Sequence, residues 1–109
     1  MYAEAGNLEV ALSFLEAMWR QTENEQIRQS FEIRMKELMI ERDVRILEAA
    51  VAQYRERDGD LPKQLTDLVK RGPLRLLPQE PFGGEYRLDP KTGAVTSSTH
   101  PERLRVHRP

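Results

Sequence analysis

The segment Glu25–Arg57 constrains the fold more than any other part of the chain, because it contains neither glycine nor proline. Apolar residues follow its first part at spacings of four, four and three: Ile27, Phe31, Met35 and Leu38. A second apolar stripe, displaced around the helix, follows its last part: Ile40, Val44, Leu47, Val51 and Tyr54. The segment is therefore predicted to be helical, and as one continuous helix it would be about 50 Å long at ~1.5 Å per residue.

The change of stripe near Glu41–Arg42–Asp43 leaves two interpretations open. One is a short loop that joins two helices. The other is a single long helix whose halves pack against different partners. We favour the continuous helix, because no helix breaker is present and the local residues are compatible with helix.

A second amphipathic segment precedes this helix, with apolar residues at Leu8, Ala11, Leu12, Leu15, Met18 and Trp19. Gly6 followed by Asn7 is typical of a helix C-cap followed by an N-cap. We therefore expect a turn at Gly6–Asn7 and a helix over about residues 8–22. Either Thr22 or Asn24 is expected to cap the helix that follows.

Turn signals divide the last part of the chain into short elements. Asp58–Gly59 is expected to end the long helix. Leu61–Pro62 then begins a short helix that Gly72–Pro73 stops, with three inward residues. These inward residues are Leu65, Leu68 and Val69.

The sequence "DPKTG", from Asp89 to Gly93, predicts a turn that ends in a left-handed glycine, which is typical of a β-hairpin. The expected strands contain Tyr86 and Leu88 on one side and Ala94–Val95 on the other, and "RLRVH" at 103–107 alternates as a third strand would. The preceding "LPQEPFGG" predicts a rigid entry into the hairpin, anchored by Phe82 and Tyr86. The whole pattern predicts an α+β fold, in which a hairpin or three-stranded sheet packs on the second half of the long helix through Leu47, Val51 and Tyr54.

Composition limits the classes of function. The 109 residues carry a formal net charge of −1, which gives no overall attraction to nucleic acid, and they include no cysteine, which excludes disulfides and thiolate metal sites. No apolar run approaches the ~20 residues of a membrane span, so we expect the fragment itself to be soluble and not to insert into a membrane.

The N-terminal segment resembles the second half of a tetratricopeptide repeat. The resemblance covers about residues 2–22, in which large, small and apolar positions follow that family's order: Tyr2, Gly6, Ala11, Leu15 and Met18. It implies that the small Ala11 allows two helices to approach closely. It also implies that the chain starts inside a repeat of about 34 residues and continues a longer array.

The segment from Arg42 to Ser98 resembles the globular part of type II secretion pseudopilins and related type IV pilin-like proteins. The shared order is a helix that ends in "Y…DG", then "LP" with a short "L..LV" helix, then "LP.EPFGG.Y", a hairpin and a serine pair. Two features of that family differ here. The preceding "ENEQIRQSFEIRMKELMIERD" is charged, and "SSTHPERLRVHRP" replaces an acidic calcium loop, so we expect neither filament assembly nor calcium binding.

The two resemblances together imply the C-terminal region of a bacterial tetratricopeptide protein that ends in a pilin-like segment, of the kind often attached to the cell envelope. The expected domains are residues 1–41, a helical lead-in, and residues 42–109, a helix with a small sheet; the long helix, about 25–57, is shared. We expect the following positions to define the fold: Gly6, Ala11, Gly59, Pro62, Pro78, Pro81, Phe82, Gly83, Gly84, Tyr86 and Gly93.

Catalytic and metal chemistry find little support in the sequence. Ser97, Ser98 and Thr99 precede His100, but a base adjacent in sequence on an extended strand rarely points at its neighbour. We expect His100 and His107 to be solvated tail residues, and we expect no enzymatic activity. No cofactor is expected either.

The acidic and basic side chains have structural explanations of their own. Asp58, Asp60 and Asp89 are spaced for caps and turns, with Asp60 capping the short helix and Asp89 the hairpin, so we expect no metal site. A small basic cluster contains Arg103, Arg105, His107 and Arg108, which Arg71 and Arg75 extend. Without interleaved aromatic residues, this cluster predicts a solvated face and no nucleic-acid partner.

Protein interaction is the function that the sequence favours. The candidate residues are Tyr2, Phe14, Met18 and Trp19, on the helix where neighbouring repeats would stack. Phe14 and Tyr2 are expected at an exposed edge, whereas Trp19 and Phe31 are expected in the core. We predict a non-catalytic interaction module that caps a tetratricopeptide array, bound to upstream repeats or to another protein, with self-association through residues 1–22. A pseudopilin-like subunit of a secretion or pilus machine is the alternative, and an enzyme of unknown class is a distant one.

Overall fold

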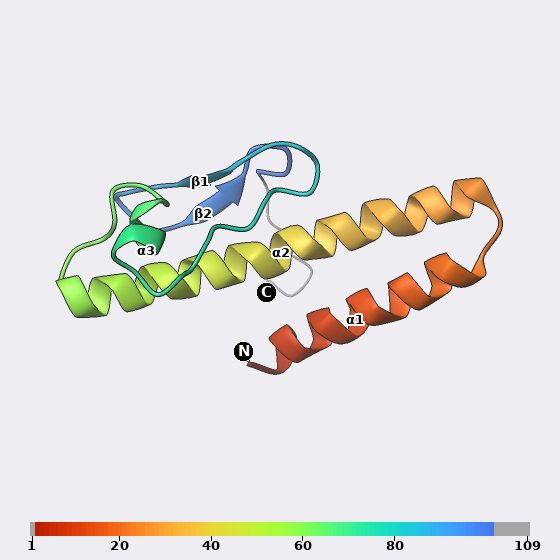
Figure 1. Cartoon of the computed structure of the whole chain (residues 1–109), viewed down its shortest axis with the longest axis horizontal. Helices are drawn as coiled ribbons and strands as arrows, with labels where there is room; N and C mark the ends of the chain where they lie inside the picture. The colour runs from red at the N-terminus through yellow and green to blue at the C-terminus, as the bar shows by residue number, and fades with distance from the viewer. Residues whose placement is uncertain (1, 102–109) are drawn as a thin grey trace. The chain divides into compact units, whose positions relative to one another are not determined.

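The computed structural model describes residues 2–101, with side chains from Asn7 onward, and it is a mixed α+β structure. The elements in chain order are α1 (Tyr2–Gln21), α2 (Glu25–Asp58), α3 (Asp67–Lys70), β1 (Tyr86–Leu88) and β2 (Val95–Ser97), as Figure 1 shows. The chain divides into two compact units, unit 1 (Met1–Arg42) and unit 2 (Asp43–Pro109). No helix of the described part of the chain is long and apolar enough to cross a membrane.

Helix α2 is continuous through Glu41–Asp43, which confirms the prediction of a single long helix. Its start is capped by Asn24 rather than Thr22, because the Asn24 Oδ1 atom accepts a hydrogen bond of 3.1 Å from the Ile27 N–H group. Its end is marked by Gly59, which has a φ of 85° and donates from its N–H group to the Arg55 carbonyl at 2.7 Å. The helix therefore begins and ends where the sequence supplies a cap.

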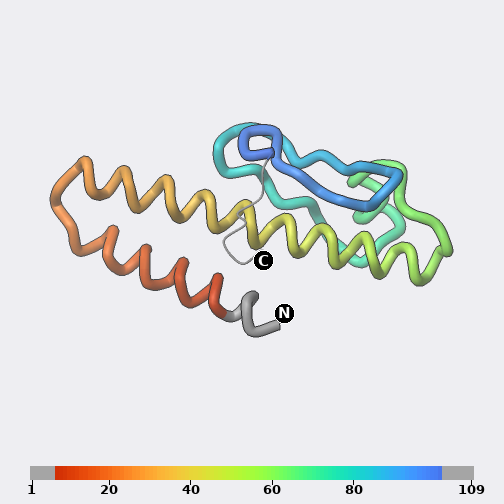
Figure 2. The backbone as a smooth tube through the Cα atoms, turned by 180° about the vertical axis from the view of Figure 1, so that it is seen from behind, coloured from red at the N-terminus to blue at the C-terminus, as the bar shows by residue number. Residues whose placement is uncertain are grey.

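Unit 1 is a pair of helices, in which α1 runs antiparallel beside the first half of α2 (Figures 1 and 2). The predicted turn at Gly6–Asn7 is wrong, because α1 begins at Tyr2 and passes through Gly6. A glycine inside a helix costs only about 1 kcal/mol relative to alanine, and Ala3, Glu4 and Ala5 before it are good or compatible helix residues. Gly6 therefore does not make the helix-to-helix turn that the repeat resemblance implied.

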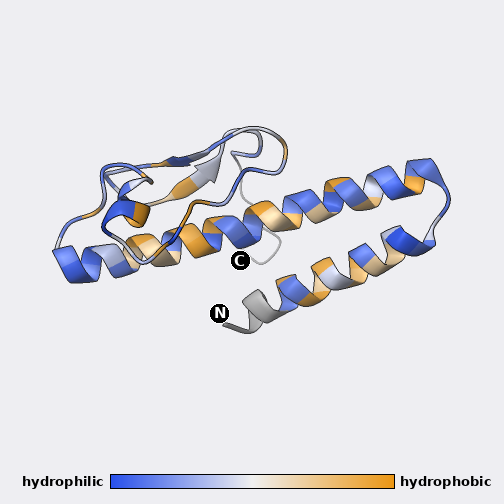
Figure 3. Ribbon diagram, in the orientation of Figure 1, coloured by the Kyte–Doolittle hydropathy of each residue, from blue (hydrophilic) through white to orange (hydrophobic). Residues whose placement is uncertain are grey.

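Unit 2 packs a β-hairpin on the second half of α2, as predicted. The predicted contact residues of α2 are all buried, with exposed fractions of 0% for Leu47, 3% for Val51 and 7% for Tyr54. Strands β1 and β2 pair antiparallel, with Tyr86 opposite Ser97 and Leu88 opposite Val95. In Figure 3 the hydrophobic residues of this half of α2 lie next to the hairpin.

The turn of the hairpin has the geometry that its sequence predicted. Gly93 has a φ of 83°, and its N–H group donates to the Asp89 carbonyl at 2.7 Å. The Asp89 side chain caps the turn, since its Oδ1 atom accepts from the Lys91 N–H group at 2.9 Å. The sheet of the described residues has two strands. The predicted third strand at 103–107 lies outside the described residues.

Helix α3 is shorter than the sequence predicted. Residues before it form turns closed by i→i+3 hydrogen bonds, such as the 2.9 Å bond from the Leu68 N–H group to the Leu65 carbonyl. The N-cap residue is Thr66, whose side chain makes no capping hydrogen bond, so the predicted cap by Asp60 is wrong. Within the preceding turns, the Asp67 Oδ2 atom accepts from the Lys63 N–H group at 3.2 Å. Leu68 is fully buried, as expected of an inward residue.

Candidate functional site

The apolar surface of α1 extends around more of the helix than one neighbouring helix can cover. At 100° per residue, apolar side chains span an arc of about 220°, whereas a core-facing stripe on a surface helix is typically somewhat more than ~100° wide. The residues on this arc, in order around the helix, are Ala17, Val10, Phe14, Met18, Ala11, Leu15, Leu8, Trp19 and Leu12.

Exposure divides this arc into two parts. The part next to α2 is half-buried and includes Leu12, Leu15 and Trp19. The other part is exposed, with Val10 at 68% and Phe14 at 64%, and Ala17 lies beside them. We call these three residues the outer face of α1. The prediction that Phe14 lies at an exposed edge is confirmed, while the side chain of Tyr2 lies outside the described residues.

Trp19 belongs to the packed side of unit 1, as the sequence favoured. Its indole Nε1–H group donates to the Glu32 Oε2 atom at 2.9 Å, and the Arg28 guanidinium lies 4.1 Å from the centre of its ring. A cation over an indole face is stabilising by roughly 0.5–2 kcal/mol. Both contacts join α1 to α2, so Trp19 holds the helix pair together. Met18 and Phe31 are half-buried.

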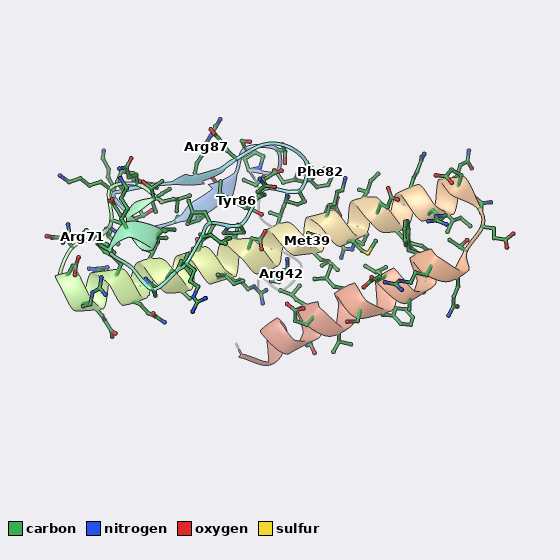
Figure 4. All side chains as sticks on the ribbon, viewed as in Figure 1. Met39, Arg42, Arg71, Phe82, Tyr86 and Arg87 are labelled. Atoms are coloured by element: carbon green, nitrogen blue, oxygen red, sulfur yellow. The ribbon has the colours of Figure 1, made fainter. Side chains whose placement is uncertain are left out.

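A groove of about 420 Å³ lies between α1 and α2 within unit 1. Its lining combines thioether, indole and carboxylate groups: Glu9, Leu12, Ser13, Glu16, Trp19, Glu32, Met35, Met39 and Arg42 (Met39 and Arg42 are labelled in Figure 4). The carboxylates already have partners, because Glu9 pairs with Arg42 at 3.8 Å and Glu16 pairs with Arg20 at 2.7 Å. The groove therefore offers apolar surface more than unsatisfied charge.

In unit 2, the Pro- and Gly-rich stretch encloses the carboxylate of Glu80, whose residue is 7% exposed. The Oε1 atom accepts from the N–H groups of Phe82 at 2.6 Å and Gly84 at 3.1 Å. The Oε2 atom accepts from the Ser97 hydroxyl at 2.6 Å and from the Thr99 hydroxyl. The backbone amides that could have bound an external anion are thus occupied by an anion of the same loop.

Burial alone would raise the pKa of Glu80, because a charged carboxylate loses solvation. Hydrogen bonds from Ser97, Thr99, Gly84 and Phe82 outweigh that effect and lower the pKa to about 2. Glu80 is therefore ionised at neutral pH, and it acts as an acceptor for four donors. Such a carboxylate is a poor general base, since proton transfer is most effective when the pKa lies near the working pH.

The serine, threonine and histidine that follow are part of this same cluster. Ser97 is 1% exposed; besides donating to Glu80, its Oγ atom accepts from the N–H groups of Thr99 at 3.1 Å and His100 at 3.0 Å. The His100 ring stacks on Phe82 with centroids 4.5 Å apart, and its Nδ1 atom lies 2.9 Å from the Thr99 hydroxyl. His100 is half-buried and stacks on Phe82, so it is less solvated than the prediction of a solvated tail residue. His107 lies outside the described residues.

Close approach explains why glycine occupies position 84. A Cβ atom there would lie 2.3 Å from the Ser98 Oγ atom and 2.7 Å from the Thr99 Cγ2 atom. Gly83 beside it has a φ of 87° and donates to the Glu80 carbonyl at 3.1 Å. The paired glycines thus let the loop close over Glu80.

Two further carboxylates attach the hairpin to α2. The Tyr86 hydroxyl donates to the buried Asp43 at 2.8 Å, and the Val95 N–H group donates to Glu48 at 2.9 Å. The bond from Val95 to Glu48 occupies an N–H donor on the edge of β2 that does not pair with β1. Among the predicted prolines, Pro62 is buried, while Pro78 and Pro81 are half-buried. Both predicted anchors, labelled in Figure 4, make specific contacts: Phe82 stacks on His100, and Tyr86 donates to Asp43.

Sequence reasoning missed Glu80 and the two carboxylates that hold the hairpin. The signal for Glu80 was a glutamate between two prolines, just before paired glycines, with hydroxyl residues following the second strand. Of the aspartates considered for metal, Asp58 pairs with Arg57 at 3.3 Å and Arg71 at 3.4 Å. No group of three or more potential metal ligands is assembled among the described residues. Of the predicted basic cluster, residues 103–108 lie outside the described residues.

Comparison with known proteins adds no relative: a scan of protein-family models, a search of curated proteins and a search of solved structures found no match to this chain. The surface features above are therefore the basis for a functional proposal.

Proposed function

We propose that this protein is a non-catalytic protein-interaction module that binds apolar helices through the outer face of α1. The observation that carries the proposal is the exposed part of the α1 arc, where Val10 and Phe14 are 68% and 64% exposed. Large apolar side chains side by side on a helix surface mark an interaction site more often than isolated ones. The partner class is a protein with an apolar helix of its own.

The particular partner that we propose is a stack of helical repeats of the tetratricopeptide type, which the chain would cap. Each repeat in such an array buries its apolar face against the neighbouring repeat. A helix pair at the end of the array therefore uses one of its faces to cover the last repeat. In this proposal, the outer face of α1 covers the last repeat of the array. The bacterial envelope location implied by the resemblances is part of the same proposal.

Amide hydrogen exchange on a fusion tests the capping proposal. Three consensus repeats of about 34 residues are joined ahead of the chain, and exchange in α1 is compared with that of the chain alone at low micromolar concentration. We expect exchange across α1 to slow by about tenfold or more when the outer face is covered. Exchange that the added repeats leave unchanged would contradict the proposal.

Two substitutions make the fusion experiment specific. Phe14→Glu should abolish the added protection, because it places a charge in the proposed contact. Ile33→Glu is the matched control, since Ile33 is another exposed apolar residue, 52% exposed, on α2. The control should retain the protection; equal effects of both substitutions would indicate a general loss of helix stability instead of a contact.

A pseudopilin-like subunit is the second candidate function. The order of elements in unit 2 supports it, because a long helix, a short helix and a hairpin follow one another as the pilin-like resemblance implied. The two candidates differ in what precedes them in the gene. A segment encoding an apolar helix of ~20 residues directly upstream would favour the pilin-like subunit, whereas several repeats of about 34 residues would favour the cap.

A further inference from the structure

A chain of hydrogen bonds joins the loop before the hairpin to the segment that follows β2. The Thr99 hydroxyl donates to the Glu80 Oε2 atom, and the Thr99 Oγ1 atom lies 2.9 Å from the His100 Nδ1 atom. The second contact permits two arrangements, because either the hydroxyl or a protonated Nδ1 atom can be the donor. These arrangements correspond to the two tautomers of the neutral imidazole ring.

The charge of Glu80 decides between the two tautomers. An ionised carboxylate only accepts hydrogen bonds, and Glu80 is ionised at neutral pH because its pKa is lowered to about 2. The single hydroxyl proton of Thr99 therefore points to Glu80, since otherwise two oxygen atoms would face each other with no proton between them. Only lone pairs of the Thr99 Oγ1 atom remain for His100, so the ring nitrogen has to be the donor.

We propose that Glu80, acting through Thr99, holds His100 as the Nδ1–H tautomer and thereby closes a latch on the segment after β2. We call Glu80, Thr99 and His100 the His100 latch. In this latch, the Nδ1–H group donates to Thr99, and Thr99 donates to Glu80. Protonation of the ring adds a proton at Nε2 and keeps the Nδ1–H donor, so the neutral ring and the charged ring both hold the latch closed.

Contacts around the ring support this assignment. The His100 ring stacks on Phe82 with an interplanar angle of 27°, and the His100 N–H group donates to the Ser97 Oγ atom at 3.0 Å. Both contacts limit rotation of the ring away from Thr99. The Nε2 atom bonds to no described residue, and no buried side-chain nitrogen or oxygen of the described residues lacks a partner, so Nε2 is open to solvent.

The latch gives Glu80 a conformational role, because it fastens the backbone after β2 to the loop. Glu80 is a positioning residue in this sense: it determines, through Thr99, which nitrogen of His100 carries the proton. All three residues belong to unit 2, so the latch does not depend on the proposed function of the outer face of α1.

Nitrogen NMR of the imidazole ring tests the tautomer. The full chain carrying His107→Gln has His100 as its one histidine, so the ring signals need no assignment. The measurement is made at about pH 8.5, well above the ~6.5 of an ordinary histidine, to observe the neutral ring. We expect Nδ1 to give the signal of a protonated nitrogen and Nε2 that of an unprotonated one. The reverse result would overturn the proposal.

Two substitutions of Thr99 form a matched pair in this background. Thr99→Val removes the hydroxyl and keeps the branched shape. His100 should then shift to the Nε2–H tautomer, because an Nδ1–H group would face a methyl group while an Nε2–H group bonds to water. Thr99→Ser retains the hydroxyl and should retain the Nδ1–H tautomer. The same tautomer in both variants would overturn the proposal.

Glu80→Gln tests the direction of the latch from its other end. The two backbone N–H groups that bond to Oε1 cannot reverse, so the amide oxygen takes that side and the NH₂ group faces Thr99. The Thr99 hydroxyl then turns and donates to Nδ1, so the two nitrogen signals of His100 should exchange positions. Ser97 cannot turn in the same way, because its Oγ atom already accepts two N–H groups.

A control separates this effect from a general effect of charge. Glu85→Gln removes the same charge from an exposed position and should leave the tautomer of His100 unchanged. An Nδ1–H tautomer that persists in Glu80→Gln, or an equal change in both variants, would overturn the role of Glu80. If Glu80→Gln does not fold, the Thr99 pair decides alone, since Thr99→Ser keeps every hydroxyl of the latch.

Discussion

At the scale of single residues, Glu80 shows how a buried charge can organise a loop. Its carboxylate accepts two backbone N–H groups and two hydroxyl groups, and these donors come from both ends of the hairpin. A buried ion without such partners would cost several kcal/mol, but hydrogen bonds to the charged form reverse the balance. The loop therefore depends on one ionised side chain.

Replacing Glu80 by glutamine should destabilise unit 2 by about 1–3 kcal/mol, because the amide NH₂ group would face a donor where the carboxylate oxygen now accepts. Urea unfolding followed by circular dichroism measures the loss. Glu85→Gln is the matched control: Glu85 is exposed and its contact with Arg87, at 3.0 Å, is a surface ion pair. The control should change stability by less than about 0.5 kcal/mol. Equal losses in the two variants would show that the Glu80 contacts contribute little.

The same residue predicts a dependence of stability on pH. The pKa of Glu80 is about 2 in the folded chain against 4.5 for an ordinary glutamate, so the unfolded chain takes up the proton more readily. Its contribution is therefore fully present above about pH 4.5 and is lost as the pH falls towards 2. The stability difference between the parent chain and Glu80→Gln should shrink over this range. A difference that stayed constant from pH 6 to pH 2.5 would argue against an ionised Glu80.

At the scale of elements, α2 combines two environments in one helix. Its residues from Val44 to Tyr54 supply most of the core of unit 2, and Asp43 and Glu48 bind the hairpin through hydrogen bonds. The first half contributes to the helix pair of unit 1. Helix propensity and a good N-terminal cap are enough to keep the backbone of α2 regular from its first half to its second half.

Leu47→Ala and Ile46→Ala form an adjacent pair that tests this division of roles within α2. Leu47 is 0% exposed and Ile46 is 44% exposed, although they are neighbours on the same helix. Leu47→Ala should cost about 2–5 kcal/mol because it leaves a cavity, whereas Ile46→Ala should cost less than ~1 kcal/mol. Thermal unfolding by circular dichroism compares them. Similar losses would mean that the hairpin does not pack against this side of α2.

The sequence predicted those elements whose signals are local. The breaker-free segment predicted α2, Gly59 and Gly93 predicted a helix end and a hairpin turn, and all three lie where expected. Gly6 misled the prediction of α1, since a lone glycine among good helix formers does not end a helix. The exposure of Phe14 followed from its place on the helix. The local pattern around Glu80 did not reveal its hydroxyl partners, because Ser97 and Thr99 are 17 and 19 residues away.

At the scale of the whole molecule, burial is concentrated in unit 2. None of the α1 side chains that the structure describes is buried. On α2, by contrast, the buried residues of unit 2 include Val44, Leu47, Ala50, Val51 and Tyr54. Local opening is easiest where few apolar contacts must be broken. The stability of the molecule is therefore expected to be uneven along the chain.

Native-state hydrogen exchange should reveal this unevenness. In dilute solution, amides of α1 should exchange about tenfold to a thousandfold faster than those of Val44–Tyr54, which corresponds to roughly 1.4–4 kcal/mol of opening free energy. Mass spectrometry of the peptic peptides measures both segments in one experiment. Equal protection in the two segments would indicate that α1 opens only with the whole molecule.

The placement of Trp19 against Arg28 and Glu32 has a practical consequence for optical work. Trp19 is the one tryptophan in the sequence and lies in unit 1, whereas Tyr54 and Tyr86 lie in unit 2. Its fluorescence emission thus reports on the helix pair, while tyrosine absorbance reports mainly on the hairpin side. Melting curves recorded with the two chromophores would coincide if the units unfold together and separate if the helix pair melts first.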